Sequence, residues 1–303
     1  AAASCSTIRK MARAERPRAG RSPAAVLRRC GLIAAVPLLA ACAVATPAER
    51  AAQADALAAA QGWQKQRFAA PPFTLLGYVG PANPGPSRTL AVYIEGDGLA
   101  WEHRTRPSSD PTPIDPVGLK LALQDRSRYR LYLARPCQYL PPAELARCNP
   151  VYWQGRRLAP EVIAALDAAI EQRKATTGAR DIALFGWSGG GAAAALLAAR
   201  RHDVVRLVTI AADLDLARWT RLKGVDPLEG SLDPADQAAA LQAIPQLHFV
   251  GLDDDIVPPA VLDGFLAHMP DRSRVTVVRV PDFSHHCCWA RDWPVLLRRA
   301  GEP

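Results

Sequence analysis

The sequence predicts an α/β domain, built on one mostly parallel sheet that helices cover on both faces. Strand-like and helix-like segments alternate along the chain from about residue 73, which is typical of a parallel sheet with helical crossovers. The chain has 303 residues, of which 49% are hydrophobic, so one large core can form. We find no internal repeat and expect no second globular domain.

The strands are predicted from short apolar runs and the helices from the longer segments between them. The predicted strands cover 73–78, 90–95, 130–134, 181–185, 206–210, 247–250 and 275–280. The predicted helices cover 160–176, 191–201, 235–243, 257–269 and 293–299. Two longer loops, 99–125 and 135–160, are rich in proline and aromatic residues and are expected to form the rim of a substrate pocket. The connection between the strands 206–210 and 247–250 has room for little beyond one helix, so no large lid domain is expected.

The most specific motif in the chain is residues 186–190, whose sequence GWSGG fits G-x-S-x-G. It lies between a predicted strand and a predicted helix, the context in which this motif presents a nucleophilic serine. Gly186 and Gly190 permit a tight turn with Ser188 at its apex, and the first N–H groups of the helix favour negative charge there. A phosphate loop is the alternative, but no Gly-Lys-Ser/Thr follows and the spacing G-x-G-x-x-G is missing.

A nucleophilic serine needs a base that takes its proton and an acid that orients the base. The acidic residues 253–255 and the histidines His285 and His286 each follow a later predicted strand. The order serine, acid, histidine was not used to find the serine and therefore supports it independently. Here the sequence resembles the α/β-hydrolase family, over roughly residues 70–300.

The resemblance selects one acid. Segment 251–258 fits the pattern G-x-x-D-x-x-V-P, which looks like the acid loop of the family and favours Asp254 over Asp253 and Asp255. The two neighbours would then cap a helix or face solvent. Asp213, which follows an earlier predicted strand, is a second candidate, because some members of the superfamily carry the acid at that position.

Two adjacent histidines compete for the role of base. The family pattern P-x-x-x-H, which starts here at Pro281, selects His285, a few residues past the last predicted strand. Side chains of consecutive loop residues seldom point the same way, so only one of the two is expected to reach Ser188. His286 is then a neighbour that packs or forms a hydrogen bond.

The remaining requirement is a pair of N–H groups that stabilise an oxyanion. The predicted strand 90–95 ends in residues 96–98 (GDG), which resemble the His-Gly-x stretch of the family, although Glu95 stands where histidine is usual. The resemblance implies that Asp97 and Gly189 donate these N–H groups, and a plain glycine turn is the alternative. A carboxylate beside a developing oxyanion would oppose catalysis, so the side chain of Asp97 must point away or be paired.

The N-terminal segment resembles a bacterial lipoprotein signal peptide. Arg28 and Arg29 precede an apolar run that ends in a lipobox, LAAC, at residues 39–42. The run is too short to span a bilayer comfortably. An ordinary secretory signal, with Cys42 incidental, is the alternative. The expected division of the chain is a targeting segment 1–41, a lipidated tether 42–65 with room for one helix, and a hydrolase domain 66–303.

The expected partners follow from this N-terminal segment. Ala43, not aspartate, follows the lipobox cysteine, which implies retention at the outer membrane if the cell is Gram-negative. Eight basic residues and Glu15 give residues 1–41 a net charge of +7 out of a total of +8, leaving +1 for the processed chain. We therefore expect a membrane and a small acyl substrate as partners, and no nucleic acid.

Four cysteines besides Cys42 remain in the processed chain, and an even number in an exported protein favours disulfides. Cys137 and Cys148 bracket a short rim loop and are candidates for one bridge. Cys287 and Cys288 directly follow the histidines; they form a vicinal bridge, pair with the rim cysteines or stay reduced. A zinc site is disfavoured, because four consecutive ligands cannot converge on one tetrahedral ion.

The sequence therefore predicts an exported, lipid-anchored serine hydrolase that needs no cofactor. Ser188 attacks an acyl carbonyl, His285 transfers the proton, and Asp254 orients the histidine. A carboxylic ester is the expected substrate, and a serine peptidase of the same fold is the alternative. A non-catalytic envelope lipoprotein that uses the fold only for binding is a third hypothesis, from a different class.

Overall fold

The computed structural model describes residues 45–103 and 105–299. The chain divides into two units, residues 1–43 and 44–303, and the sheet belongs to the second. The expected targeting segment and Cys42 lie outside the described residues.

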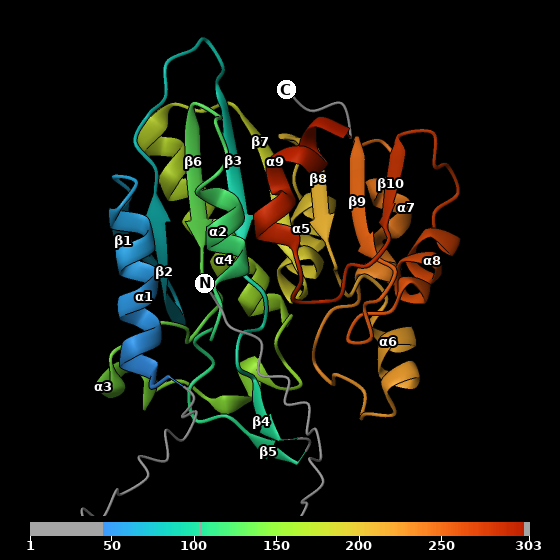
Figure 1. The fold of residues 1–303 in the computed structure, drawn as a ribbon, viewed down its shortest axis with the longest axis horizontal. Helices are drawn as coiled ribbons and strands as arrows, with labels where there is room; N and C mark the ends of the chain where they lie inside the picture. Colours follow the sequence, from blue (N-terminus) through green and yellow to red (C-terminus); the bar gives the residue numbers. More distant parts are fainter. Residues whose placement is uncertain (1–44, 104, 300–303) are drawn as a thin grey trace, which may run out of the picture. The chain divides into compact units, whose positions relative to one another are not determined.

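The second unit contains an eight-stranded sheet with the order β1-β2-β6-β3-β7-β8-β9-β10 (Figure 1). β2 pairs antiparallel with both β1 and β6. From β6 to β10 every neighbouring pair is parallel, so the carboxyl ends of these strands meet at the same end of the sheet. The strands are β1 (Gln64–Ala70), β2 (Phe73–Val79), β3 (Thr89–Ile94), β6 (Tyr129–Leu133), β7 (Asp181–Trp187), β8 (Val204–Ile210), β9 (Gln246–Gly251) and β10 (Val275–Val280).

Helices cover both faces of the sheet, which confirms the predicted fold class. Helices α4, α5 and α8 join one core cluster, and α1, α2 and α9 join the other. Alternate residues of β3 enter opposite clusters: Val92 packs in the first, and Ala91 and Tyr93 pack in the second. A strand buried on both faces is apolar throughout, which is why it stands out in the sequence. The helices are α1 (Pro47–Ala59), α2 (Val117–Ala122), α3 (Pro142–Leu145), α4 (Pro160–Thr177), α5 (Gly189–Arg200), α6 (Leu216–Lys223), α7 (Ala238–Leu241), α8 (Pro259–Ala267) and α9 (Trp289–Arg299).

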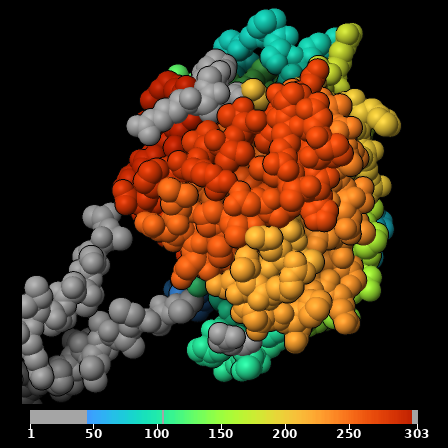
Figure 2. All heavy atoms as spheres, turned by 90° about the vertical axis from the view of Figure 1, so that its right-hand side faces the viewer, coloured from blue at the N-terminus to red at the C-terminus, as the bar shows by residue number. Residues whose placement is uncertain are grey.

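The described connections between the strands hold helices, turns and one small hairpin. Between β8 and β9 lie α6, the 3-10 turn Pro234–Gln237 and α7, and the described residues form no separate lid domain there. The first rim loop holds α2 and a hairpin of β4 (Trp101–His103) and β5 (Arg106–Pro107), and the second holds α3 and the 3-10 turn Pro150–Trp153. Figure 2 shows a face formed mainly by the second half of the chain, coloured from yellow to red. None of the described helices is long and apolar enough to cross a membrane.

The N-terminal end of the domain differs from the expected tether. Helix α1 packs against the sheet, and β1 already begins at Gln64. Thr46 and Glu49 form a reciprocal capping box at the start of α1, and Ala54 and Ala58 are buried in the second core cluster. A helix that buries mainly alanine has a weak hydrophobic periodicity, so its sequence looks like that of a tether.

Helix α9 begins at Trp289 rather than at residue 293, and it continues through Pro294. Proline has no N–H to offer to the carbonyl of the residue four positions earlier, which is Ala290 here. The side chain of Gln124, just after α2, donates to that carbonyl at 2.6 Å. The helix can start before its proline because a neighbouring element supplies the missing donor.

If α1 is part of the folded domain, a charge on its buried side should destabilise the whole domain. We expect Ala54→Asp to lower the free energy of unfolding by about 2 kcal/mol or more, because an unpaired carboxylate would enter the core. Ala56→Asp, on the exposed side of the same helix, should change it by less than about 0.5 kcal/mol. Urea unfolding measures both; equal values would show that α1 behaves as a tether.

Candidate active site

The predicted site residues lie on loops at the carboxyl ends of parallel strands. Ser188 follows β7, Asp254 follows β9, His285 follows β10 and Asp97 follows β3. β3 and β7 are neighbours in the sheet. The next strand of this sheet after β3 is β6, which lies on the far side of β3, and the next strand after β7 is β8, which lies on the far side of β7. Ligands of open α/β sheets bind at such a switch point, so this end of the sheet is where a site is expected.

Three of these side chains form one hydrogen-bonded chain. His285 Nε2 lies 3.0 Å from Ser188 Oγ, and His285 Nδ1 lies 2.8 Å from Asp254 Oδ2. His285 and Asp254 are buried, whereas Ser188 is partly exposed. A neutral imidazole whose Nδ1–H donates a hydrogen bond to the carboxylate leaves Nε2 free to accept the serine proton. The arrangement can therefore activate Ser188 as a nucleophile.

The turn around Ser188 is strained and tightly packed. Ser188 has a φ of 53° and a ψ of −129°, a conformation that residues other than glycine rarely adopt. A Cβ atom on Gly186 would collide with the carbonyl of Gly190, and one on Gly190 would collide with the carbonyl of Ile94. Only glycine lets α5 approach the strands so closely, and this approach sets the position of the serine.

Of the candidate acids, the structure brings Asp254 to His285. The second oxygen of Asp254 accepts two backbone N–H groups of its own loop, at 2.9 and 2.8 Å, so the carboxylate is held at both oxygens. Asp253 and Asp255 are exposed. Asp213 is buried, and the charges that act on it belong to a different group of side chains.

Of the candidate bases, His285 is the one bonded to the serine. His286 is exposed, and its ring packs edge-on against that of His285, with 5.2 Å between the ring centroids. The ring of Trp187, beside the serine, lies 5.1 Å from that of His285 and 6.0 Å from that of His286. Partial burial and the neighbouring His285 lower the pKa of His286.

The side chain of Asp97 is paired, as its position near the turn of Ser188 requires. Arg135 Nη1 and Arg157 Nη1 donate to its two oxygens at 3.1 and 2.7 Å, and both arginine side chains are buried. Burial raises the pKa of Asp97, but Arg157 and Arg135 outweigh that effect, and the pKa lies below its usual value. A Cβ on Gly189 would collide with this carboxylate, so the two expected oxyanion donors are neighbours.

Glu95, at the place where histidine is usual in the family, is fully buried and fastens β3 to α2. Its carboxylate accepts the N–H groups of Gly118 and Leu119 at 3.0 and 3.3 Å and the hydroxyl of Tyr132 at 3.0 Å. Burial raises the pKa of Glu95 to about 7, although these hydrogen bonds act against it. The departure from the family pattern thus has a structural role.

Cys137 and Cys148 form the expected disulfide, with their Cα atoms 6.0 Å apart. The bridge fastens the segment that follows β6. From this segment Gln138 Nε2 donates to the carbonyl of Gly96 at 3.0 Å, and Arg135 donates to the carboxylate of Asp97. The rim loop therefore holds the loop that carries the expected oxyanion donor.

Three residues of the site were missed in the sequence: Arg135, Gln138 and Arg157. The need for a partner of Asp97 pointed to a nearby cation, but the chain has 37 lysines and arginines and no local pattern marks two of them. These contacts join loops that are distant in the sequence.

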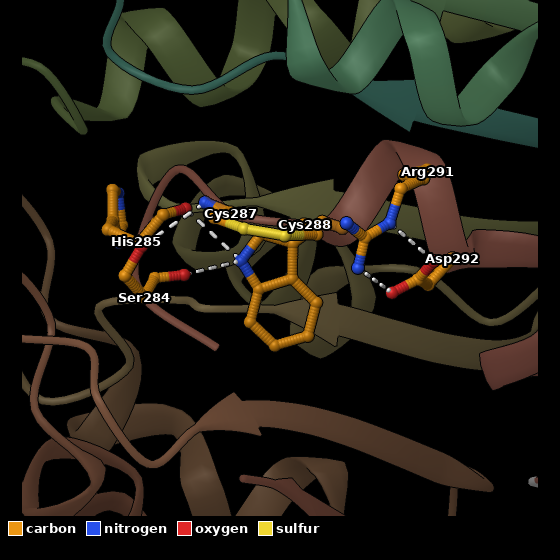
Figure 3. Close-up of a disulfide and its surroundings, with 7 residues drawn as sticks. Ser284, His285, Cys287, Cys288, Arg291 and Asp292 are labelled. Atoms are coloured by element: carbon orange, nitrogen blue, oxygen red, sulfur yellow. Dashed lines mark hydrogen bonds and ion pairs between the residues drawn. A yellow bond between two sulfur atoms is a disulfide. The ribbon is translucent and has the colours of Figure 1, made fainter. Parts of the chain in front are cut away.

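Cys287 and Cys288 form the vicinal bridge, one of the three alternatives for this pair (Figure 3). Trp289 follows the bridge and starts α9. Its indole N–H donates to the carbonyls of Ser284 and His285, at 3.1 Å in each case. Trp289, the first residue of α9, thus fixes the backbone around the base, His285. Within the described residues, no group of three or more histidine, cysteine or acidic side chains is placed to hold a metal ion.

No protein-family model and no curated protein matches the sequence, but solved structures share its fold. An acylaminoacyl peptidase from Pyrococcus horikoshii aligns with a TM-score of 0.56 and 14% identity over 74% of this chain, which spans only 37% of that protein. A lidless α/β serine hydrolase from Xanthomonas campestris aligns with a TM-score of 0.51 and 17% identity over 78% of this chain and 94% of its own. An esterase from Pyrococcus furiosus aligns with a TM-score of 0.55 and 13% identity over 82% and 92%. These similarities establish the α/β-hydrolase fold.

The N–H group of Trp289 should keep His285 in line with Ser188. Trp289→Phe removes this N–H but keeps a ring in its place. We expect the variant to slow the labelling of Ser188 by a fluorophosphonate by about tenfold or more, because a small misplacement of the base is costly.

Trp293→Phe is the matched control. Trp293 is equally buried on the same helix, and its indole N–H has no partner among the described residues. Both substitutions lose similar packing, and Trp289→Phe also loses hydrogen bonds, so its melting temperature should fall somewhat further, while the labelling rate should fall only for Trp289→Phe. Equal labelling rates for the two variants would rule out the positioning role.

Proposed function

We propose that this protein is a serine hydrolase that cleaves a carboxylic ester through a covalent acyl-enzyme. The observation that carries the proposal is the hydrogen-bonded chain from Ser188 through His285 to Asp254 at the apex of a strained turn. Proteins described as esterases or serine hydrolases have the same fold, which supports the proposal.

The residues would act in a fixed order. Ser188 Oγ attacks the acyl carbonyl while its proton passes to His285 Nε2, and Asp254 stabilises the imidazolium. The N–H groups of Asp97 and Gly189 stabilise the oxyanion, and the paired arginines keep the carboxylate of Asp97 from opposing it. His285 then protonates the leaving alkoxide. Water attacks the acyl-enzyme with the help of the same histidine and restores the serine.

A serine peptidase is the second candidate, because an acylaminoacyl peptidase is among the proteins with this fold. Activity of the purified protein on p-nitrophenyl esters and on aminoacyl p-nitroanilides separates the two. A purely binding role is distinguished by a fluorophosphonate, because only an activated serine reacts with it.

We also propose that the protein is exported and lipid-anchored through Cys42, at the outer membrane if the cell is Gram-negative. The lipobox at residues 39–42 carries this proposal. The two disulfides support export, because disulfides persist in oxidising compartments. The membrane would then hold the hydrolase through the N-terminal lipid.

Ser188→Ala should abolish both ester hydrolysis and labelling by a fluorophosphonate, because the nucleophile is lost. We expect kcat/KM for a p-nitrophenyl ester to fall by about 10³-fold or more. The melting temperature should not fall, since a smaller side chain fits the apex of the turn. Hydrolysis by this variant well above the uncatalysed rate would refute the proposed nucleophile.

The two adjacent histidines supply a matched control for the same assay. His285→Ala should lower kcat/KM by about 10³-fold or more, as loss of a triad member does. His286→Ala removes the same side chain one residue later, at an exposed position, and should lose far less. If the losses were reversed, the base would be His286; if both variants stayed active, the triad would be wrong.

Cys42→Ser should prevent the incorporation of labelled palmitate and release the protein from the membrane fraction. The reason is that the lipid is attached to the thiol of this residue. Cys30→Ser changes the nearest cysteine before the lipobox and should keep both the label and the membrane association. Palmitate that persists in Cys42→Ser, or that is lost in Cys30→Ser, would contradict the assignment of the lipobox.

A further inference from the structure

A second group of charged side chains lies beside the serine, on loops that follow β3, β6 and β8. Asp97 is paired at both oxygens with Arg135 and Arg157. Asp213 is not part of these ion pairs. It is 3% exposed, and the charges that act on it are those of Asp97, Arg157 and Arg135.

The loop that carries Asp213 packs against the turn of the nucleophile. Ser188 N–H donates to the carbonyl of Ile210, at the end of β8, at 2.9 Å. A Cβ on Gly191 would collide with the Cβ of Ala212, the residue before Asp213. Asp213 therefore lies beside the first turn of α5, close to the nucleophile.

Asp213 has an open acceptor. Its Oδ1 is buried and has no hydrogen-bond partner among the described residues. Burial, together with the nearby Asp97 carboxylate, raises the pKa of Asp213 to about 7, although Arg157, the backbone N–H of Asp213 itself and Arg135 oppose the shift. A buried polar atom without a partner is costly and rare, and a donor that arrives with a bound substrate would satisfy it.

We propose that Asp213 determines specificity for the acyl part of the substrate: its Oδ1 accepts a hydrogen bond from an uncharged hydroxyl or amide N–H of that part. The preferred substrates are then esters of hydroxy acids or N-acylamino acids rather than of plain fatty acids. This inference rests on the proposed hydrolase function.

The donor belongs to the acyl part because of where the leaving group must be. His285 returns the proton to the leaving oxygen, so this oxygen stays on the His285 side of the serine. Asp97 touches Gly189, on the side of the expected oxyanion donors, and Asp213 lies near Asp97. The part of the substrate that remains on the serine is the part closest to Asp213.

The donor is uncharged because of the charges around it. With Asp213 ionised, the two positive charges of the arginines and the two negative charges of Asp97 and Asp213 cancel, so an ammonium group would lose its hydration without meeting a net opposite charge. A substrate carboxylate would face Asp213 itself, while the arginines are already bonded to Asp97. A hydroxyl or an amide N–H avoids both conflicts.

The test compares kcat/KM of the detergent-solubilised full chain for p-nitrophenyl butyrate, 2-hydroxybutyrate and 3-hydroxybutyrate, each divided by its uncatalysed rate. We expect the wild-type protein to prefer the better hydroxy ester by about tenfold or more, and Asp213→Leu to reduce this preference by about tenfold. Asp226→Leu changes an exposed carboxylate after α6 and should keep the wild-type preference.

Two further esters separate the chemical classes: the 3-aminobutyrate carries an ammonium group, and the hemisuccinate carries a carboxylate. A wild-type preference for either of these over the hydroxy esters would overturn the proposal. So would a wild-type ratio near one, which needs no variant, or a ratio that Asp213→Leu leaves unchanged. Failure of the hydrolase function itself is distinct, because then Ser188 is not labelled by a fluorophosphonate and no ester is cleaved.

Discussion

The contact between the first turn of α5 and the backbone at the ends of β3 and β7 is the constraint on which the site depends. Gly186 and Gly190 allow backbone to lie directly on backbone there. The chain must turn sharply to enter the helix, and Ser188 takes up the strain at positive φ. The loops after β3 and β8 pack against the same turn. The contact that positions the serine therefore also positions the residues around it.

This close contact brings acidic side chains to the place where an oxyanion would form, and two of them, Asp97 and Glu95, are compensated by other groups. Arg135 and Arg157 neutralise Asp97, so that its carboxylate does not oppose an oxyanion in a buried site. Glu95 accepts the N–H groups at the start of α2, where a helix favours negative charge. A carboxylate can therefore replace the usual histidine because its oxygens are bonded to the start of α2 and to Tyr132.

The sheet and the order of the site residues could be predicted because each depends on a short stretch of sequence. The run 90–95 is apolar throughout since β3 is buried on both faces, and Ser188, Asp254 and His285, which the structure brings together, each follow a separate strand. The arginines that hold Asp97 could not be predicted, because their contacts join distant loops. A helix was expected near α1, but its packing against the sheet was not, because α1 buries mainly alanine and so lacks an apolar stripe.

The side chains that would carry the chemistry lie on loops, and each loop is fastened by its own bonds. Two backbone N–H groups hold Asp254, Trp289 holds the carbonyls around His285, and the rim disulfide holds the segment that reaches Asp97. Groups fixed in this way need no rearrangement when a substrate binds, and little of the binding energy is then spent on ordering them. Among the described carboxylates only Asp213 has a buried oxygen without a partner. The other acidic groups of the site already have partners, so a substrate gains most binding energy from a donor that reaches this oxygen. Selectivity should therefore depend on the presence of that donor rather than on the length of the acyl chain.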